Sequence, residues 1–176
     1  MDTRSAELLE FPLIRERLSA YAAFEPSRRL TSTLEPATDP IIVTRRQDET
    51  DEARWLLSEK PNVGIGGAHD IEPILARASR GGRLDPGELW AVVETIIATG
   101  RLADGLRELD RPLLHTLYRS LDPLPVLRTR LEASVDAGGE VLDTASPALS
   151  GLRRAVRLAH ERLRNRLDAL IRSEVA

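Results

Sequence analysis

The sequence predicts an all-α fold, a helical core bundle that continues into one long C-terminal helix. Apolar residues recur every three or four positions through most of the chain, which is the spacing of one helix face. A capping residue followed by proline, as at Asp39 and Pro40 or at Ser146 and Pro147, marks several helix starts. Extended structure is indicated only near residues 140–142, where we expect at most a minimal β piece.

The first 60 residues are expected to form three helical stretches. Residues 5–23 have a helical pattern, with a helix start at Phe11 and Pro12. A second short helix is expected over residues 26–34, and a third over residues 39–60. This third helix is heavily charged, and we expect only a narrow stripe of it to be buried, namely Ile42, Ala53, Leu56 and Leu57.

The middle of the chain is expected to alternate helices with tight connections. Asp70 is placed to cap a short helix, which Gly81 and Gly82 would end. Asp85 and Glu88 have the spacing of a capping box, in which each side chain accepts the backbone N–H of the other residue. They would start a long apolar helix. Two further helices are expected after it, at residues 112–120 and 125–133.

Residues 139–176 form the stretch around which the chain is organised. Ser146 is an N-cap residue and Pro147 fits the first helical position. The helical pattern then continues to Ala176 without a closing glycine or proline, so we expect a long helix that is truncated. We therefore divide the chain into a helical core domain at residues 1–138 and, at residues 139–176, a short extended piece with the start of that helix.

Composition narrows the class of protein. The 176 residues allow one domain with an ordinary core, and the absence of cysteine excludes disulfides and thiolate metal sites. No apolar run is long enough to span a membrane, so we expect a cytoplasmic protein without a membrane partner. The net charge of −3 argues against a generally basic nucleic-acid binder, yet the stretch after Pro147 holds seven arginines against three acids.

The sequence contains no recognisable catalytic, metal or nucleotide site. His69, His115 and His160 are far apart, and no second histidine follows His160 at the spacing of a helical zinc site. The glycine-rich loop at residues 64–67 lacks the Lys-Ser/Thr pair of a phosphate loop, and no apolar strand precedes it. We therefore expect this chain itself to have no enzymatic activity, no cofactor and no ATP binding.

The C-terminal helix carries two surfaces that could contact partners. Its arginines are candidates for weak contacts with nucleic-acid phosphates: Arg153, Arg154, Arg157, Arg164 and Arg166. Its apolar stripe is a candidate for self-association: Leu152, Val156, Leu163, Leu167 and Leu170. The arginines equally fit the solvated flank of a coiled coil, balanced by Glu161, Asp168 and Glu174.

Short motifs in a fixed order connect the chain to a known family. The first are Leu9 to Phe11, Leu34 to Pro36, Glu49 with Thr50, and Glu52 with Ala53. A denser block contains Gly66, Gly67, Asp70, Ile71, Leu75, Ala78, Gly82, Leu84, Glu88 and Leu89. The most specific comprises residues 139–143 and 145–147 with Leu149 and Arg153. In order and spacing these motifs resemble the N-terminal core and lever region of the type-two MutS proteins, bacterial paralogues associated with suppression of recombination.

The resemblance implies a mechanical role, in which a helical core and the base of a lever link a remote ATPase to a DNA clamp. In that family a clamp, an ATPase domain and a C-terminal Smr endonuclease domain follow. The whole protein would be a homodimer that binds branched DNA, hydrolyses ATP with Mg²⁺ and acts in DNA repair. Some members are linked to collided ribosomes. No catalytic or nucleotide-binding residue is implied here, because no position of this chain matches those motifs.

Two other functions are compatible with the sequence alone. A self-contained helical adaptor would bind another protein through the apolar stripe, and an enzyme would need a site that no motif reveals. A following sequence with a clamp and a phosphate loop would favour the lever role implied by the resemblance, whereas a natural stop at Ala176 would favour the adaptor.

Overall fold

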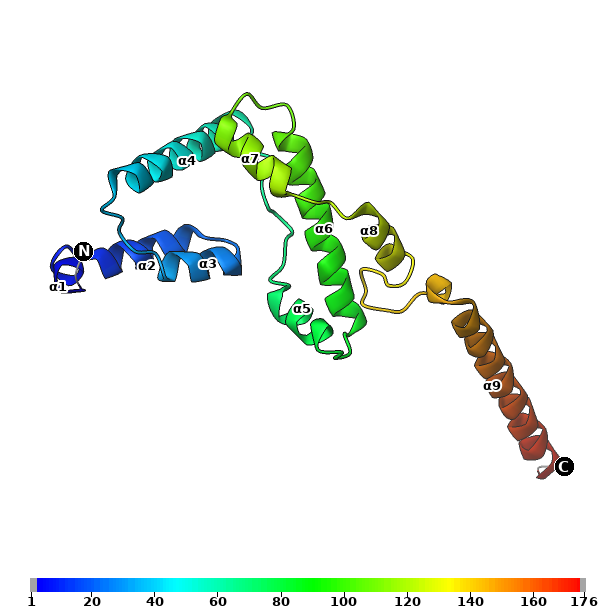
Figure 1. Ribbon diagram of the computed structural model, residues 1–176. Helices are drawn as coiled ribbons and strands as arrows, with labels where there is room; N and C mark the ends of the chain where they lie inside the picture. Colours follow the sequence, from blue (N-terminus) through cyan, green and yellow to red (C-terminus); the bar gives the residue numbers. More distant parts are fainter. Residues whose placement is uncertain (1–2, 175–176) are drawn as a thin grey trace.

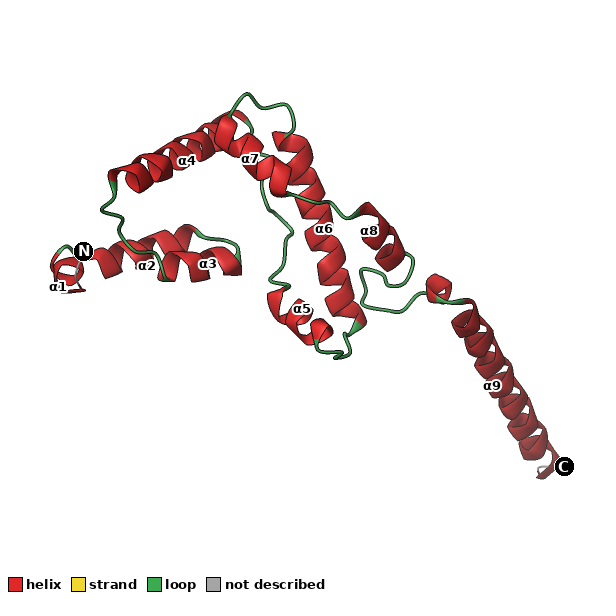
Figure 2. Cartoon of the chain, viewed as in Figure 1, coloured by secondary structure: helices red, strands yellow, loops and turns green. Residues whose placement is uncertain are grey.

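A computed structural model describes the backbone of residues 3–174 and the burial of the side chains of residues 4–167. All regular elements in this part of the chain are helices, so the predicted all-α class is confirmed (Figure 2). The β structure there is a single antiparallel bridge between Val135 and Val141, which agrees with the expected minimal β piece. The helices are α1 (Thr3–Leu8), α2 (Phe11–Tyr21), α3 (Glu25–Ser32), α4 (Pro40–Glu59), α5 (Glu72–Ser79), α6 (Pro86–Leu106), α7 (Pro112–Ser120), α8 (Pro125–Glu132), the 3₁₀ turn η1 (Asp143–Ala145) and α9 (Pro147–Glu174).

The molecule is elongated, with α6 as its central rod (Figure 1). Helices α7 and α8 lie against α6, and α4 packs on α7. Helices α1, α2 and α3 form a small unit to one side, in which α2 and α3 run side by side. Helix α9 leaves the opposite side and points away from the rest of the chain. The N-terminal unit and α9 are therefore two projections from one central body.

The core is built mainly by one helix. Helix α6 is apolar on most of its surface, and its buried residues include Val93 and Leu106, which are both fully inaccessible to solvent. A cluster around its C-terminal half joins it to α4 through Leu56 and to α7 through Leu114. Burying a leucine completely stabilises a fold by about 1.5–3 kcal/mol. The packing around α6 therefore sets the position of the elements on both sides of it.

Local capping determines where several helices begin, as predicted. The backbone N–H of Ile41 donates to the carboxylate of Asp39 at 2.9 Å, which starts α4. The N–H of Asp85 donates to the carboxylate of Glu88 at 2.9 Å, which is the return bond of the predicted capping box. That bond, together with an ion pair to Arg77, holds the pKa of Glu88 below its ordinary value.

The start of α7 is capped from another helix. The carboxylate of Glu52 on α4 accepts the backbone N–H groups of Leu113 and Leu114 at 3.1 and 2.9 Å. These are free donors of the first turn of α7, and a carboxylate also suits the positive end of the helix dipole. One side chain of α4 therefore fixes both the position and the start of α7.

The expected apolar stripe of α4 is wrong for three of its four members. Only Leu56 is buried; Ala53 is exposed, and Ile42 and Leu57 are 45% and 64% exposed. Helix α4 contacts the body where α7 crosses its C-terminal half, which leaves Ile42 open to solvent; within that half, Leu56 is the residue that enters the core cluster with Leu114. Sequence periodicity identifies the apolar face of a helix, but it cannot show how much of that face has a neighbour.

Charged side chains tie the N-terminal unit to α5. The guanidinium of Arg29 on α3 donates to both carboxylate oxygens of Asp70, at 2.6 and 3.2 Å, and to Glu72 at 3.0 Å. The N-cap position of α5 is Ile71, one residue after the predicted Asp70, but the Asp70 carboxylate still accepts the backbone N–H of Glu72 in the first turn at 3.4 Å. The bond from Arg29 is the main reason that the pKa of Asp70 is lowered.

We expect two helical glycines to respond in opposite ways to replacement by alanine. A Cβ at Gly151 in α9 would meet no atom within 4 Å, so Gly151→Ala should stabilise that helix by about 0.5–1 kcal/mol. A Cβ at Gly105 in α6 would lie 2.6 Å from both methyl groups of Val63, so Gly105→Ala should destabilise the protein by about 1–3 kcal/mol. Thermal unfolding and amide hydrogen exchange of α9 would measure both effects. Equal responses of the two variants would contradict this packing of α6.

Acid should detach the N-terminal unit before the helices unfold. Because the pKa of Asp70 is lower in the folded protein, its contribution is complete above the ordinary value of about 4 and is lost as the pH falls through the folded value. We expect the radius of gyration from small-angle scattering to rise in this range while helical circular dichroism is kept. In Arg29→Gln the increase should already be present at neutral pH. An Arg29→Gln variant with the dimensions and acid response of the original protein would show that other contacts hold the unit.

Candidate nucleic-acid interface

The start of α9 is fixed by the predicted cap. The backbone N–H of Leu149 donates to the hydroxyl of Ser146 at 3.1 Å, and Pro147 occupies the first helical position, where no donor is needed. The helix extends over 28 residues to Glu174, which corresponds to about 42 Å at 1.5 Å per residue.

A small network joins this helix to the body. The hydroxyl of Thr144 donates to the carbonyl of Ala133 at 2.7 Å, which links η1 to the end of α8. The guanidinium of Arg153 on α9 donates to the carboxylate of Asp143 on η1 at 2.7 Å. Arg153, a candidate for phosphate contact, therefore already has a carboxylate partner at the root of α9.

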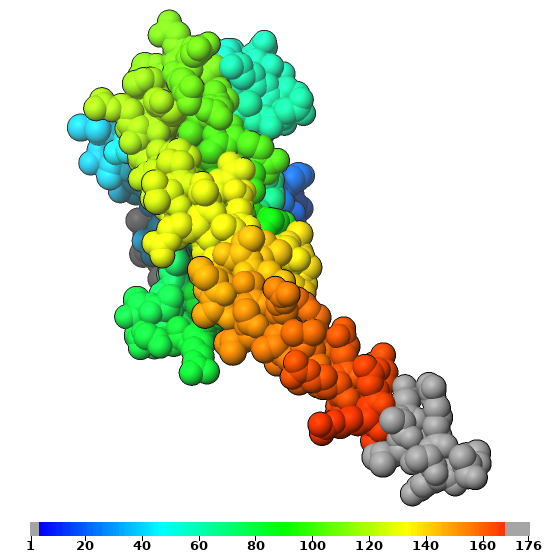
Figure 3. All heavy atoms as spheres, turned by 90° about the vertical axis from the view of Figure 1, so that its right-hand side faces the viewer, coloured from blue at the N-terminus to red at the C-terminus, as the bar shows by residue number. Residues whose placement is uncertain are grey.

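Beyond this root, the described side chains of α9 lie open to solvent. All residues from 154 to 167 are exposed, and Figure 3 shows this part of α9 standing clear of the remaining atoms. The apolar stripe lies open to solvent: the exposed fractions are 65% for Leu152, 54% for Val156, 56% for Leu163 and 50% for Leu167. Leu170, the fifth predicted member, lies outside the described side chains.

Helix geometry separates the candidate arginines into groups. At about 100° per residue, Arg153, Arg157 and Arg164 fall within about 40° of one another on one face. Arg154 lies about 100° from Arg153, and Arg166 lies on the far side of the helix, at about 220° from Arg153. Among the described side chains, Arg154 and Arg157 form no ion pair. Arg153 already pairs with Asp143, and Arg166 lies on the far side. The candidates best placed to contact a nucleic acid from one side of the helix are therefore Arg154, Arg157 and Arg164.

The other sequence candidates have structural explanations. His69 pairs with Glu94 on α6 at 2.6 Å, and its backbone N–H donates to the Thr95 hydroxyl at 3.0 Å. The carbonyl of Gly66 accepts from Arg101 of α6 at 2.7 Å. The glycine-rich loop is thus a connector bound to α6. No group of three or more metal-ligating side chains occurs among the described residues.

Sequence reasoning missed Asp143 as the partner of Arg153. Both residues belong to the most specific block of the family resemblance, and that shared membership was the one indication in the sequence that they are related. Their spacing of ten positions, however, crosses a turn and the start of a helix, and it matches no local rule.

Together, the fold and this surface define a class: a helical scaffold segment with a projecting two-faced helix. Over 100% of its length, the chain is 41% identical to a protein named Endonuclease MutS2 from Symbiobacterium thermophilum. Proteins of the same name from Pelotomaculum thermopropionicum and Thermomicrobium roseum are 35% and 36% identical over 98% and 97% of the chain. The chain is therefore homologous to one segment of the type-two MutS proteins, which confirms the resemblance.

The chain matches only one part of each of these relatives. The chain spans about a fifth of the length of these relatives, 22% in each case. A comparison with protein-family models found no match. Within the described residues, no helix is long and apolar enough to cross a membrane.

We expect the chain to self-associate through the stripe on α9, because soluble monomers seldom expose such a continuous apolar surface. A second copy offers the same stripe, and a two-fold pairing closes on itself. Leu163→Glu combined with Leu167→Glu should therefore give a monomer in light scattering. The matched control is Leu158→Glu, on the opposite side of the same helix, which should leave the association intact. A monomeric original chain at tens of micromolar would show that the stripe needs no such cover.

Proposed function

We propose that the chain is the helical core and the base of the lever in a DNA-binding ATPase of the MutS type-two kind. The observation that carries this proposal is the rooted projection of α9, with its capped start, its ion pair at the root and its exposed length. Such a helix can transmit movement between a body at one end and a contact at the other. Homology over the whole chain to proteins named Endonuclease MutS2 supports the same role.

For the whole protein we propose the family's activities. These are binding of branched DNA, ATP hydrolysis with Mg²⁺, endonuclease activity, action as a homodimer in repair and suppression of recombination, and contact with collided ribosomes. The relatives' name supports the endonuclease activity. Within this chain, the proposed contribution is mechanical coupling together with weak contacts from the arginines of α9.

The exposed apolar stripe favours a second candidate function, that of a helical protein–protein adaptor. The two candidates differ in their ligand. An adaptor would bind a protein partner through Leu163 and Leu167 without any need for the arginines. The proposed lever would use the stripe for packing against another helix and the arginines for DNA.

We expect the chain to bind branched DNA weakly, without sequence preference and with steep dependence on salt, because each phosphate contact releases counterions. Arg154→Glu combined with Arg157→Glu should abolish retardation on a branched DNA in gel electrophoresis at low salt. Arg153 is kept in this variant, since its ion pair holds the root of α9.

The control is Arg54→Glu on α4, at an exposed position far from α9 in the sequence; it should leave retardation unchanged. Retardation that survives both the α9 variant and raised salt would assign the DNA contact to another surface. A chain that fails to retard DNA at any salt concentration would remove the support for a DNA contact in this segment.

A further inference from the structure

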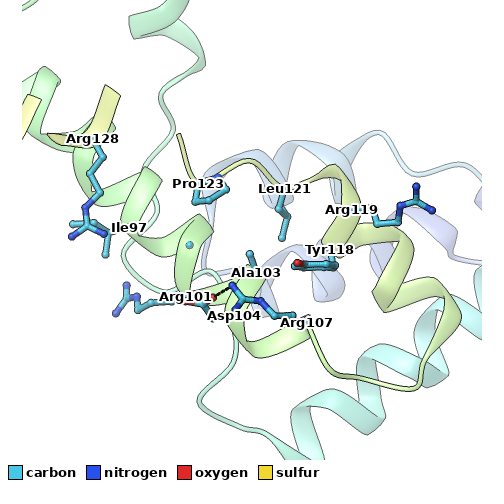
Figure 4. A pocket seen from close by; sticks show the side chains of 11 residues that line it. Ile97, Arg101, Ala103, Asp104, Arg107, Tyr118, Arg119, Leu121, Pro123 and Arg128 are labelled. Carbon is cyan, nitrogen blue, oxygen red and sulfur yellow. Dashed lines mark hydrogen bonds and ion pairs between the residues drawn. The ribbon is translucent and has the colours of Figure 1, made fainter. Parts of the chain in front are cut away.

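A basic hollow lies between α6, α7 and α8, away from the apolar stripe of α9 (Figure 4). Its volume is about 450 Å³. Four arginines line it: Arg101 and Arg107 from α6, Arg119 from α7 and Arg128 from α8. Asp104 is the only acidic lining residue. The lining thus has a formal surplus of three positive charges, in a chain whose net charge is −3.

The arginines of this basic hollow are only partly neutralised by their neighbours. Arg107 pairs with Asp104 at 2.6 Å, and Arg128 pairs with Glu132 at 2.9 Å. Counting Glu132 still leaves two more positive than negative charges. Both pairs are substantially exposed, with side-chain exposures of 60% and 69% for the first and 45% and 36% for the second. Exposed pairs of this kind are weak, so an incoming anion can compete for the same guanidinium groups.

The other two arginines of the hollow, Arg101 and Arg119, have no carboxylate partner among the described residues. Arg101 carries a charge that no carboxylate balances, but its guanidinium donates to the carbonyl of Gly66 and points away from the hollow (Figure 4), so only its stem lines the hollow. Arg119 has no ion-pair partner among the described residues, although Figure 4 shows its side chain pointing away from the hollow. The same view shows the hydroxyl of Tyr118 directed into the hollow. Planar guanidinium groups with a nearby hydroxyl suit phosphate oxygens well.

The distribution of these groups favours a polymer over a small anion. Arg107 belongs to α6, Tyr118 to α7 and Arg128 to α8, so the polar groups of the hollow come from three separate helices. A nucleotide or a free phosphate is usually held by consecutive backbone N–H groups of a glycine loop. Here side chains from three elements supply the donors, as in proteins that follow the successive phosphates of a nucleic-acid backbone.

We propose that the basic hollow is a second nucleic-acid contact, in which Arg107 and Arg128 bind backbone phosphates without reading base sequence. This inference rests on the proposed DNA-binding role and adds a second contact to the one proposed for α9, each too weak to hold DNA alone. It assigns part of the contact to the body of the molecule. A nucleic acid bound there would lie against α6, the helix that also builds the core.

The test uses the whole chain and a fluorescently labelled duplex DNA, with binding followed by anisotropy over a salt series. The hollow variant combines Arg107→Gln with Arg128→Gln, which keeps long polar side chains and removes two charges. It should weaken binding about 5- to 20-fold at low salt and reduce the slope of log affinity against log salt by about 2. The matched control is Arg83→Gln, an exposed arginine between α5 and α6, which should bind as the original chain does.

Each alternative result has a distinct meaning. If the hollow variant binds normally while Arg154→Glu with Arg157→Glu abolishes binding, this inference is wrong and the proposed function stands. If the original chain binds no duplex at low salt, this inference is wrong, and the weak DNA contact proposed for α9 loses its support. If inorganic phosphate displaces the duplex at an equal concentration of phosphate groups, the basic hollow is a small-anion site instead. Should the double variant unfold, Arg107→Gln and Arg128→Gln tested singly are each expected to show about half of the change in slope.

Discussion

The burial of α6 is the constraint on which the rest of the structure depends. Of the eleven buried apolar residues in the described part of the chain, seven belong to this helix. Helices α4 and α7 each contribute one buried leucine to the cluster on α6, Leu56 and Leu114. Aromatic residues make up only 3% of the chain, so few large side chains are available for a second core. The elements remote from α6 are consequently held by polar contacts, as at Arg29 and Asp70, or stand free, as α9 does.

Local chemistry explains which parts of the fold could be predicted from the sequence. The starts of α4, α6 and α9 depend on Asp39, Glu88 and Ser146, whose partners lie within three residues, so spacing alone identifies them. The cap on α7 comes from Glu52, 61 positions before Leu113, and no local pattern could reveal it. The sequence also indicates Asp70 as a cap, and its carboxylate does accept the N–H of Glu72, but no local pattern could reveal its bond to Arg29 from a distant helix.

The same distinction applies to the candidate contact surfaces. The two faces of α9 follow from helical periodicity, so the sequence could group its leucines and most of its arginines. Arg166 separates from the other arginines only when the angle of each residue around the helix axis is counted. The pairing of Arg153 with Asp143 and the basic hollow required the fold. The hollow gathers arginines from three helices, and each of them looks like an ordinary surface charge when the sequence is examined alone.

The narrow root of α9 has a geometric consequence. A straight helix of 28 residues held at one end amplifies small changes at that end: a rotation of about 10° at the root would carry the far end through about 7 Å. The angular stiffness of this joint, more than the length of the helix, would then set how faithfully motion passes along it.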